Sequence, residues 1–375
     1  MLEKWSHRAD LAESAINDRH ARRVWGIPMT NLAVVSWPSS TRDEFFFHWH
    51  YWWQAHYLDC QIDAYARRAT QKRKKRIANT MRGIRVRNIN PWTVNRYYDD
   101  KSWLALALGR YTHASKSKGL RALELNIEQG IDSLTGVLPW RTNETFYNVP
   151  TNGPAAIMMA RTGRIETARS LTDWMFEQLL DDDGLLMDGL RMRMHGPELV
   201  RIVYPYCQGV ALGACLEIAE RTEPEVAARY VVRVRELIDA ISAKLATPTG
   251  VIDSKTDGGD GGLFKGILVR YLADVAERLP GDSPSSQAAR RSAARLVLRS
   301  AESVWNHRLE VDGLPVFAAD WTADAQLPKN SAVHRPTIEG TVLGSTVAER
   351  DLSVQLSGWM LLEAAARCAA AGFEE

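Results

Sequence analysis

Amphipathic helical periodicity runs through almost the whole chain and leaves little room for a sheet-based fold. Between residues 263 and 275, apolar side chains follow the i, i+3, i+4, i+7 spacing that places them on one face of a helix. Similar stretches recur at intervals of roughly thirty residues. We expect further helices over residues 2–25, 45–69, 99–111, 120–131, 155–180, 200–219, 224–245, 285–304 and 352–370. Strand signals are short, at 250–252 and 313–317, so the pattern predicts an all-α protein.

Nothing in the sequence divides the chain into separate folding units. The Gly-, Pro- and Asp-rich connectors at 136–140, 181–184 and 257–262 are short, and no low-complexity linker occurs. The chain has 375 residues, 45% of them hydrophobic, which is enough for one large core. Paired helices without a strict sequence repeat favour a closed ring over a regular solenoid. We therefore expect a single domain over residues 1–375.

Composition excludes several classes of protein. The formal net charge is +2, so the chain as a whole has no strong attraction to nucleic acid. The four cysteines are far apart in sequence, which predicts reduced thiols in a reducing compartment. We find no apolar signal-peptide core near the first residue and no run of about 18 apolar residues that could span a membrane. These features predict a cytoplasmic protein.

Two adjacent carboxylates stand at the start of one expected helix, within the segment 97–103, Tyr-Tyr-Asp-Asp-Lys-Ser-Trp. From a first turn, Asp99 and Asp100 could reach one pocket with their carboxyl groups roughly 5 to 6 Å apart, close to the spacing in retaining glycosidases. Crowding raises the pKa of one carboxyl, so a neutral acid and a charged base could coexist. The alternative is helix capping, because the macrodipole favours acids in a first turn. The flanking aromatic residues favour a site that cleaves glycosidic bonds.

Aromatic residues are concentrated in the segment 45–59, which is apolar on every face and so predicts a helix buried all round. His48, His50, His56 and Asp59 would then be satisfied core groups, or they would line a pocket together with stacking rings. The chain has 13 Trp against 8 Phe. An indole ring packs well on the apolar face of a sugar, although a structural role is commoner for any single tryptophan.

Six short segments, in one order along the chain, carry a resemblance to a known family. They are 52–59, 97–103, 136–140, Asn148 with 152–153, 204–210 and 264–272. They resemble the first tryptophan-rich helix, the Asp-Asp signature, the glycine-to-tryptophan loop, the paired asparagines, the Tyr-x-Tyr-Asn-Gln-Gly element and the Phe-Lys-Gly element of glycoside hydrolase family 76, the endo-α-1,6-mannanases. Cys207 departs from this pattern, because the family usually has asparagine there. The departure would change either a sugar contact or the stability of a helix start.

The resemblance implies an (α/α)6 barrel with a groove at one end. It implies retaining hydrolysis of α-1,6-mannosidic bonds in a mannan, mannooligosaccharide or mannolipid. Asp99 would be the nucleophile that forms a covalent mannosyl-enzyme, and Asp100 the general acid/base. The residues expected to bind the sugar rings and hydroxyl groups are Trp52, Trp53, Trp140, Asn148, Tyr204, Tyr206, Gln208 and Asp260. Lys265 and Arg270 are expected to form ion pairs in the scaffold.

Three other functions stay open on the sequence alone. One is transglycosylation of α-1,6-mannan on the same covalent intermediate, and another is non-catalytic binding of mannan. The third is a sugar epimerase or isomerase with His48, His50 or His56 as its base. The chain has no HExxH, P-loop, GxGxxG or GxSxG motif, so we expect no metal and no cofactor.

Basic residues form one local excess of charge, Lys72–Arg76, which Arg82, Arg85 and Arg87 follow. Such a cluster is usually a solvated helix end. The alternative is weak contact with an anionic surface, such as a phosphate-bearing glycolipid or a layer of membrane head groups. Nucleic acid is not expected as a partner, because aromatic residues are not interleaved with these charges.

Overall fold

The inner wall of the protein is a ring of helices. The structure is a computed structural model that describes residues 2–89, 91–254, 256–329 and 341–374. The inner helices are α3 (Tyr51–Arg67), α5 (Tyr98–Arg110), α7 (Val149–Arg161), α9 (Pro205–Ala219), α11 (Gly261–Arg278) and α13 (Leu352–Ala370). Each one contacts the next, and α13 contacts α3, so the ring closes.

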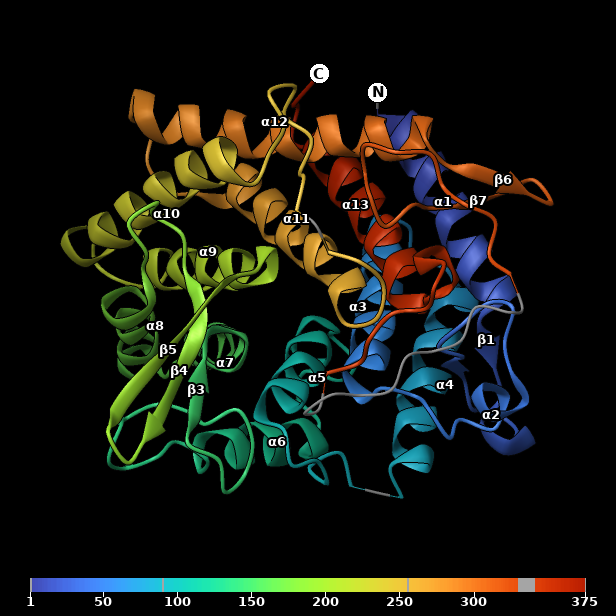
Figure 1. Cartoon of the computed structure of the whole chain (residues 1–375), viewed down its shortest axis with the longest axis horizontal. Coiled ribbons are helices and arrows are strands. Elements are labelled where there is room, and N and C mark those ends of the chain that lie inside the picture. Colours follow the sequence, from blue (N-terminus) through green and yellow to red (C-terminus); the bar gives the residue numbers. More distant parts are fainter. Residues whose placement is uncertain (1, 90, 255, 330–340, 375) are drawn as a thin grey trace.

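A second layer of helices covers this ring. It consists of α1 (Leu2–Arg19), α4 (Gln71–Arg87), α6 (Lys118–Glu128), α8 (Ile165–Leu179), α10 (Pro224–Lys244) and α12 (Pro284–Asn306). Each outer helix packs on one or two inner ones; α4, for example, packs on α3 and α6 packs on α5. The two layers form the expected (α/α)6 barrel (Figure 1). None of the described helices has both the length and the apolar composition needed to cross a bilayer.

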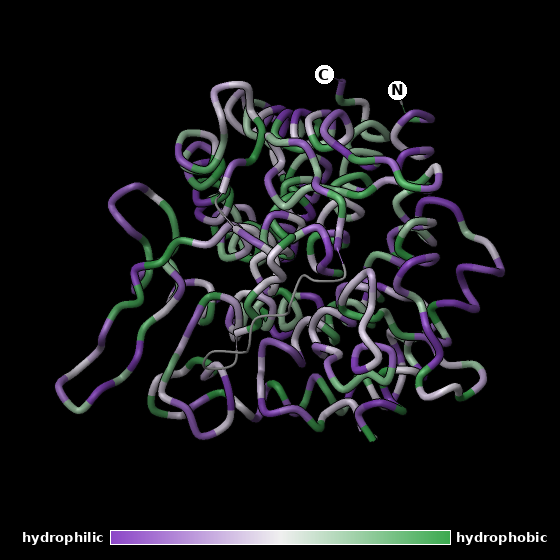
Figure 2. The backbone as a smooth tube through the Cα atoms, turned by 45° about the vertical axis from the view of Figure 1, so that its right-hand side comes forward, coloured by the Kyte–Doolittle hydropathy of each residue, from purple (hydrophilic) through white to green (hydrophobic). Residues whose placement is uncertain are grey.

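The two layers differ in how much of each helix is apolar. Helix α9 buries all its residues except Tyr206, as a helix enclosed on every side should. Helix α6 buries only a stripe, formed by Leu120, Leu123 and Ile127. Inner helices also approach closely at glycine: a Cβ on Gly209 would lie 2.9 Å from the Cα of Leu268. Hydrophilic stretches occupy loops that project at the periphery (Figure 2).

The strands are short additions to the barrel. Strands β3 (Phe146–Asn148), β4 (Met187–Arg193) and β5 (Gly196–Val203) form an antiparallel sheet in that order. Asn148 pairs with Gly189 in its register. The remaining elements are the pairs β1 (Ala21–Arg22) with β2 (Leu32–Ala33) and β6 (Leu309–Val311) with β7 (Leu314–Val316), the short helix α2 (Thr41–Glu44), and the 3-10 turns η1 (Val24–Gly26) and η2 (Ala348–Arg350).

Several expected helices have different bounds in the structure. The expected helix over 45–69 begins only at Tyr51, and Phe45 and Phe47 before it are 54% and 70% exposed, so burial on all sides was wrong for these residues. The stretch 155–180 is divided by a turn at Gly163, whose φ is +84°. The first helix ends at Arg19.

Two further elements differ from those expected, each for its own physical reason. The stretch 200–219 changes from strand to helix at Pro205, because proline suits a first helical position and cannot donate to a strand ladder. Helix α4 was not expected, because lysines and arginines interrupt its apolar stripe. Of the expected strands, 313–317 contains β7, whereas 250–252 forms only an isolated bridge through Ile252.

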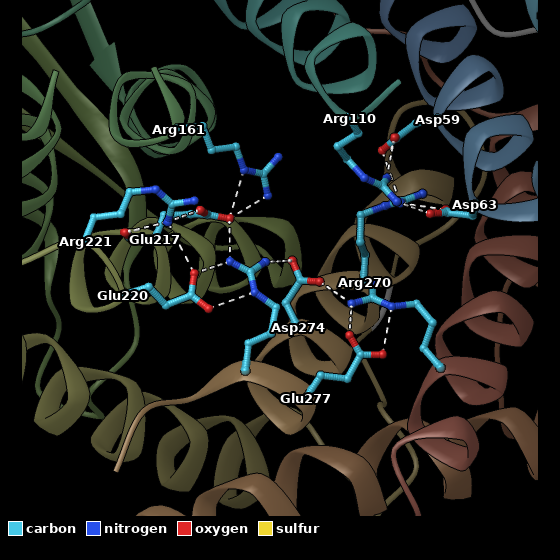
Figure 3. Close-up of polar contacts among 12 residues, drawn as sticks. Asp59, Asp63, Arg110, Arg161, Glu217, Glu220, Arg221, Arg270, Asp274 and Glu277 are labelled. Carbon is cyan, nitrogen blue, oxygen red and sulfur yellow. Dashed lines mark hydrogen bonds and ion pairs between the residues drawn. The ribbon is translucent and has the colours of Figure 1, made fainter. Parts of the chain in front are cut away.

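The C-terminal ends of the inner helices meet in a network of ion pairs around a cavity of about 730 Å³. Arg270, as expected, is a scaffold residue: it pairs with Asp59 at 3.2 Å and with Asp63 at 2.6 Å, and Arg110 pairs with the same two acids. Figure 3 shows how these residues face one another across the ring. Arg110 lies in the last turn of α5, where the macrodipole favours a cation, whereas Arg270 lies near the middle of α11. The network therefore ties the C-terminal ends of the inner helices to one another.

Candidate active site

The N-terminal ends of five inner helices, all but α13, line a second cavity, of about 790 Å³, at the other end of the barrel. Four carboxylates line it, which are Asp99, Asp100, Asp188 and Asp260. The rings that line it are those of Tyr51, Trp52, Tyr97, Trp103, Trp140, Phe146, Tyr204, Tyr206 and Phe264. The cavity thus combines acidic groups with flat apolar surfaces.

Asp99 is held by two hydrogen bonds. Its Oδ1 accepts from the backbone N–H of Asp100 at 2.8 Å, and its Oδ2 accepts from Nε1 of Trp140 at 3.0 Å. The loop that carries Trp140 is itself fixed, because Asn152 bonds both backbone groups of Leu138. Burial raises the pKa of Asp99 to about 7, although both hydrogen bonds act to lower it.

Asp100 has less support for its charged form. One side-chain hydrogen bond reaches it, from Nδ2 of Asn95 to Oδ2 at 2.7 Å. Burial raises its pKa well above the usual range, and the neighbouring charges of Asp99 and Asp260 raise it further. Asp100 is therefore suited to hold a proton while Asp99 ionises. Helix α5 begins after its N-cap residue Tyr97, so Asp99 and Asp100 lie in its first turn. Both side chains line the cavity.

Asp260 links the cavity wall to the tryptophan-rich helix. Its Oδ1 accepts from Nε1 of Trp52 at 3.0 Å and of Trp53 at 2.9 Å, and its Oδ2 accepts from the backbone N–H of Val342 at 2.7 Å. Burial raises its pKa to about 6 in spite of these bonds. Trp52 lines the cavity, whereas Trp53 is fully buried behind it.

Gln208 also lies behind the wall. Its amide carbonyl accepts from the backbone N–H of Leu186 at 2.8 Å, and Nε2 donates to the carbonyls of Leu186 and Tyr204. The side chain is fully buried and does not line the cavity. Cys207 is fully buried as well, with its Sγ 4.0 Å from Oδ1 of Asp188. Both residues fix the junction between β4 and α9.

The remaining expected residues do reach the cavity. Tyr206 stacks on Phe264 with ring centroids 3.9 Å apart, and Tyr204 packs against both rings. Asn148 lies where β3 meets α7, and its buried Oδ1 has no hydrogen-bond partner in the described part of the chain. An unpaired buried acceptor is costly unless a ligand satisfies it.

Asp188 is a cavity residue that the sequence reasoning missed. It lies on β4, and burial raises its pKa to about 7, with Asp99 raising it and Arg191 lowering it. A single aspartate between Met187 and Gly189 gives no motif. Only the pairing of β4 with β3 brings it beside the acid pair.

The histidines of the epimerase alternative are scattered. His50 lines the cavity, and His48 lies 3.5 Å from Asp43 in an ion-pair geometry. His56 is fully buried against Trp103 and faces the opposite, charged cavity. Burial and Arg270 push its pKa well below the usual range. Of the three candidate bases, only His50 therefore lines the acid-lined cavity.

The ring of helices carries, at one end, a cavity in which buried carboxyl groups with differently stabilised charges lie among aromatic rings. This arrangement is typical of a carbohydrate-processing enzyme. The comparisons with known proteins agree with this class. The chain matches the model of glycosyl hydrolase family 76 over residues 34–343, and it belongs to that family. It is therefore a glycoside hydrolase.

Several solved structures are similar to the chain over nearly their whole length. The α-1,6-mannanase GH76A of Salegentibacter sp. HEL1_6 is 27% identical, with a TM-score of 0.78 and coverage of 97% of this chain and 99% of that one. An inactive variant, with two consecutive aspartates changed to asparagine, was solved with α-1,6-mannotriose; it is 25% identical, with the same TM-score and coverage. The Lin0763 protein of Listeria innocua is 25% identical, with a TM-score of 0.78 and coverage of 98% of both chains. No curated protein matches the chain.

Proposed function

We propose that the chain is a retaining endo-α-1,6-mannanase. The observation that carries this proposal is the pair Asp99 and Asp100, which share one aromatic cavity but differ in what stabilises their charge. The similar Salegentibacter enzyme supports it, because changing two consecutive aspartates inactivates that enzyme and α-1,6-mannotriose binds to the variant.

The two carboxyls divide the reaction between them. Asp99 attacks the anomeric carbon while Asp100 gives its proton to the departing glycosidic oxygen, which forms a covalent mannosyl-enzyme. Asp100, now charged, takes a proton from water as the water oxygen attacks the same carbon and releases Asp99. Trp140 favours the charged form of Asp99 through its indole N–H, so it helps the nucleophile ionise first.

The cavity wall supplies the sugar contacts. We assign ring stacking to Trp52, Trp140, Tyr204 and Tyr206, which line the cavity. Asn148 offers its unpaired Oδ1 to a sugar hydroxyl. Trp53, Gln208 and Asp260 act mainly as positioning residues, because their polar atoms bond other parts of the protein.

Digestion of α-1,6-mannotetraose, followed by NMR, tests the proposal. We expect the α anomer as the first product, and an early β anomer would exclude retention. Products longer than the substrate would instead indicate transglycosylation on the same intermediate. No turnover, with mannotetraose binding measured by calorimetry, would favour a binding protein.

Azide rescue tests the separate roles of the two acids. In Asp100→Ala, azide should attack the covalent intermediate and give an α-mannosyl azide. In Asp99→Ala, azide should attack the substrate directly from the vacated face and give the β-azide. The reversed pattern would exchange the two roles.

A further inference from the structure

A groove on the outer surface lies between α4 and the start of α6. It has a volume of about 1180 Å³, and Ile89 and the segment 91–93 are among the residues that line it. Figure 1 shows both helices at the lower edge of the barrel. We call it the basic groove, because Lys74, Arg82, Arg85 and Lys118 line it and none of the described lining residues is an acid.

Three of the groove's cations differ from most arginines in the described part of the chain, which are paired. Lys74, Arg82 and Lys118 make no ion pair within the described residues. Their neighbours in the same basic run face the other way: Arg73 is buried and pairs with Glu13 at 2.5 Å, and Arg76 approaches the same acid. Within this basic run, Arg73 and Arg76 therefore form ion pairs that support the fold, whereas Lys74 faces the groove.

Apolar side chains accompany the cations. Met81, Val86 and Trp92 line the groove, and Ile89 stands at its edge with 80% of its surface exposed. Ile89 has a φ of +51°, which a β-branched residue rarely adopts. Such local strain is often kept where a side chain has a function. Val94, two residues after Trp92 in the chain, is 56% exposed and adds a second aliphatic side chain to this surface segment.

The same segment connects the groove with the acid pair. The carbonyl of Trp92 accepts from the hydroxyl of Tyr51 at 3.0 Å, and Asn95 bonds Asp100. Tyr97, five residues after Trp92 in the chain, lines the acid-lined cavity. The basic groove thus lies beside the open end of the barrel.

We propose that the basic groove docks the protein on an anionic membrane surface. Unpaired cations beside exposed aliphatic side chains complement phosphate head groups above acyl chains. Lys74, Arg82 and Lys118 contact head groups, while Ile89 and Val94 enter the boundary below them. Nucleic acid fits less well, because Trp92 is 6% exposed and offers no free ring for base stacking. This contact does not depend on the proposed hydrolase activity.

Sedimentation of the full chain with lipid vesicles tests the proposal. We expect binding at low salt to phosphatidylcholine vesicles that contain phosphatidylglycerol, and weak binding to phosphatidylcholine alone. Each basic residue near such a surface contributes about a fivefold factor, so Lys74→Glu, Arg82→Glu and Lys118→Glu together should lower partitioning by roughly a hundredfold or more. Ile89→Asn should also weaken binding, because asparagine tolerates a positive φ without entering the bilayer.

The matched control changes Arg291, Arg295 and Arg299 to glutamate, because these three exposed residues lie on one face of the outer helix α12. It should bind vesicles nearly as well as the wild type, with melting temperatures as the folding check. Equal loss in both triple variants, or no binding of the wild type to anionic vesicles, would overturn the proposal. Full competition by inorganic phosphate with no effect of Ile89→Asn, or preference for an oligonucleotide over vesicles, would also overturn it.

Discussion

Two neighbouring residues of one type acquire different properties from the donors around them. Asp99 accepts from an indole and a backbone N–H, whereas Asp100 has one amide donor and faces the charges of Asp99 and Asp260. The difference in charge stabilisation arises within a single helical turn. A donor from a loop far along the chain, the indole N–H of Trp140, therefore helps Asp99 to ionise before Asp100.

Replacing Trp140 with phenylalanine should raise the pKa of Asp99, because the ring stays and the N–H donor is lost. The acid limb of the kcat/KM profile should move to higher pH by roughly one to two units, since a hydrogen bond to a charged group is worth about 1.5–3 kcal/mol. The profile on mannotetraose gives the measurement. Trp174→Phe, on α8, is the control and should leave the limb in place; an unmoved limb in Trp140→Phe would contradict the assigned hydrogen bond.

Replacing Asp188 with asparagine should have the opposite effect. A negative charge near Asp99 disappears, so the pKa of Asp99 falls and the acid limb moves to lower pH. The same kcat/KM profile records it, and the two variants then shift in opposite directions. A shift toward higher pH in Asp188→Asn would show that Asp188 supports the charge of Asp99 instead.

The inner helices share one direction, and each end has its own chemistry. Their N-termini, apart from that of α13, line the acid-lined cavity, and their C-termini meet in the ion-pair network of Figure 3. Arg110, Arg161 and Arg367 all occupy last turns, where the macrodipole favours cations. The arrangement separates the stabilising charges from the proposed chemistry.

Changing Arg270 to methionine should destabilise the barrel by about 3–5 kcal/mol, because the buried acids Asp59 and Asp63 lose one of their two partners. Urea unfolding measures the loss. Arg193→Met is the matched control: its pair with Glu198 is exposed on the hairpin and should contribute no more than about 1 kcal/mol. Similar losses in the two variants would mean that Arg270 has no special role.

Sequence reasoning succeeded for elements whose signal is local. Helices α10, α11, α12 and α13 have continuous apolar stripes and were predicted to within a few residues. The acid pair was visible because its two members are adjacent in the sequence. Asp188 was not visible, because only the register of β4 on β3 brings it to the cavity. Helix α4 was missed because its charged surface obscures a narrow buried stripe.

The four cavity carboxyls together should give the whole molecule an unusual pH dependence. Their pKa values are raised by burial, so between about pH 4 and 7 the folded state binds more protons than the unfolded state, and stability falls as pH rises. The double variant Asp99→Asn, Asp100→Asn should melt higher than the wild type at pH 8, on the order of 5 °C, and nearly equally at pH 4. Calorimetry checks this, and an equal difference at both pH values would refute the linkage.

Ring closure brings the first and last helices together. Helix α1 packs on α13, and the two chain ends lie near each other (Figure 1). Leu2 and Ala370 line the same cavity. We therefore expect the same arrangement of helices to form when the chain begins and ends at a different point of the ring. A circular permutant that joins these ends through a flexible peptide and opens the chain at Met194, which is 97% exposed at the β4–β5 tip, should fold to the same barrel. Its circular dichroism and mannotetraose cleavage should match those of the parent.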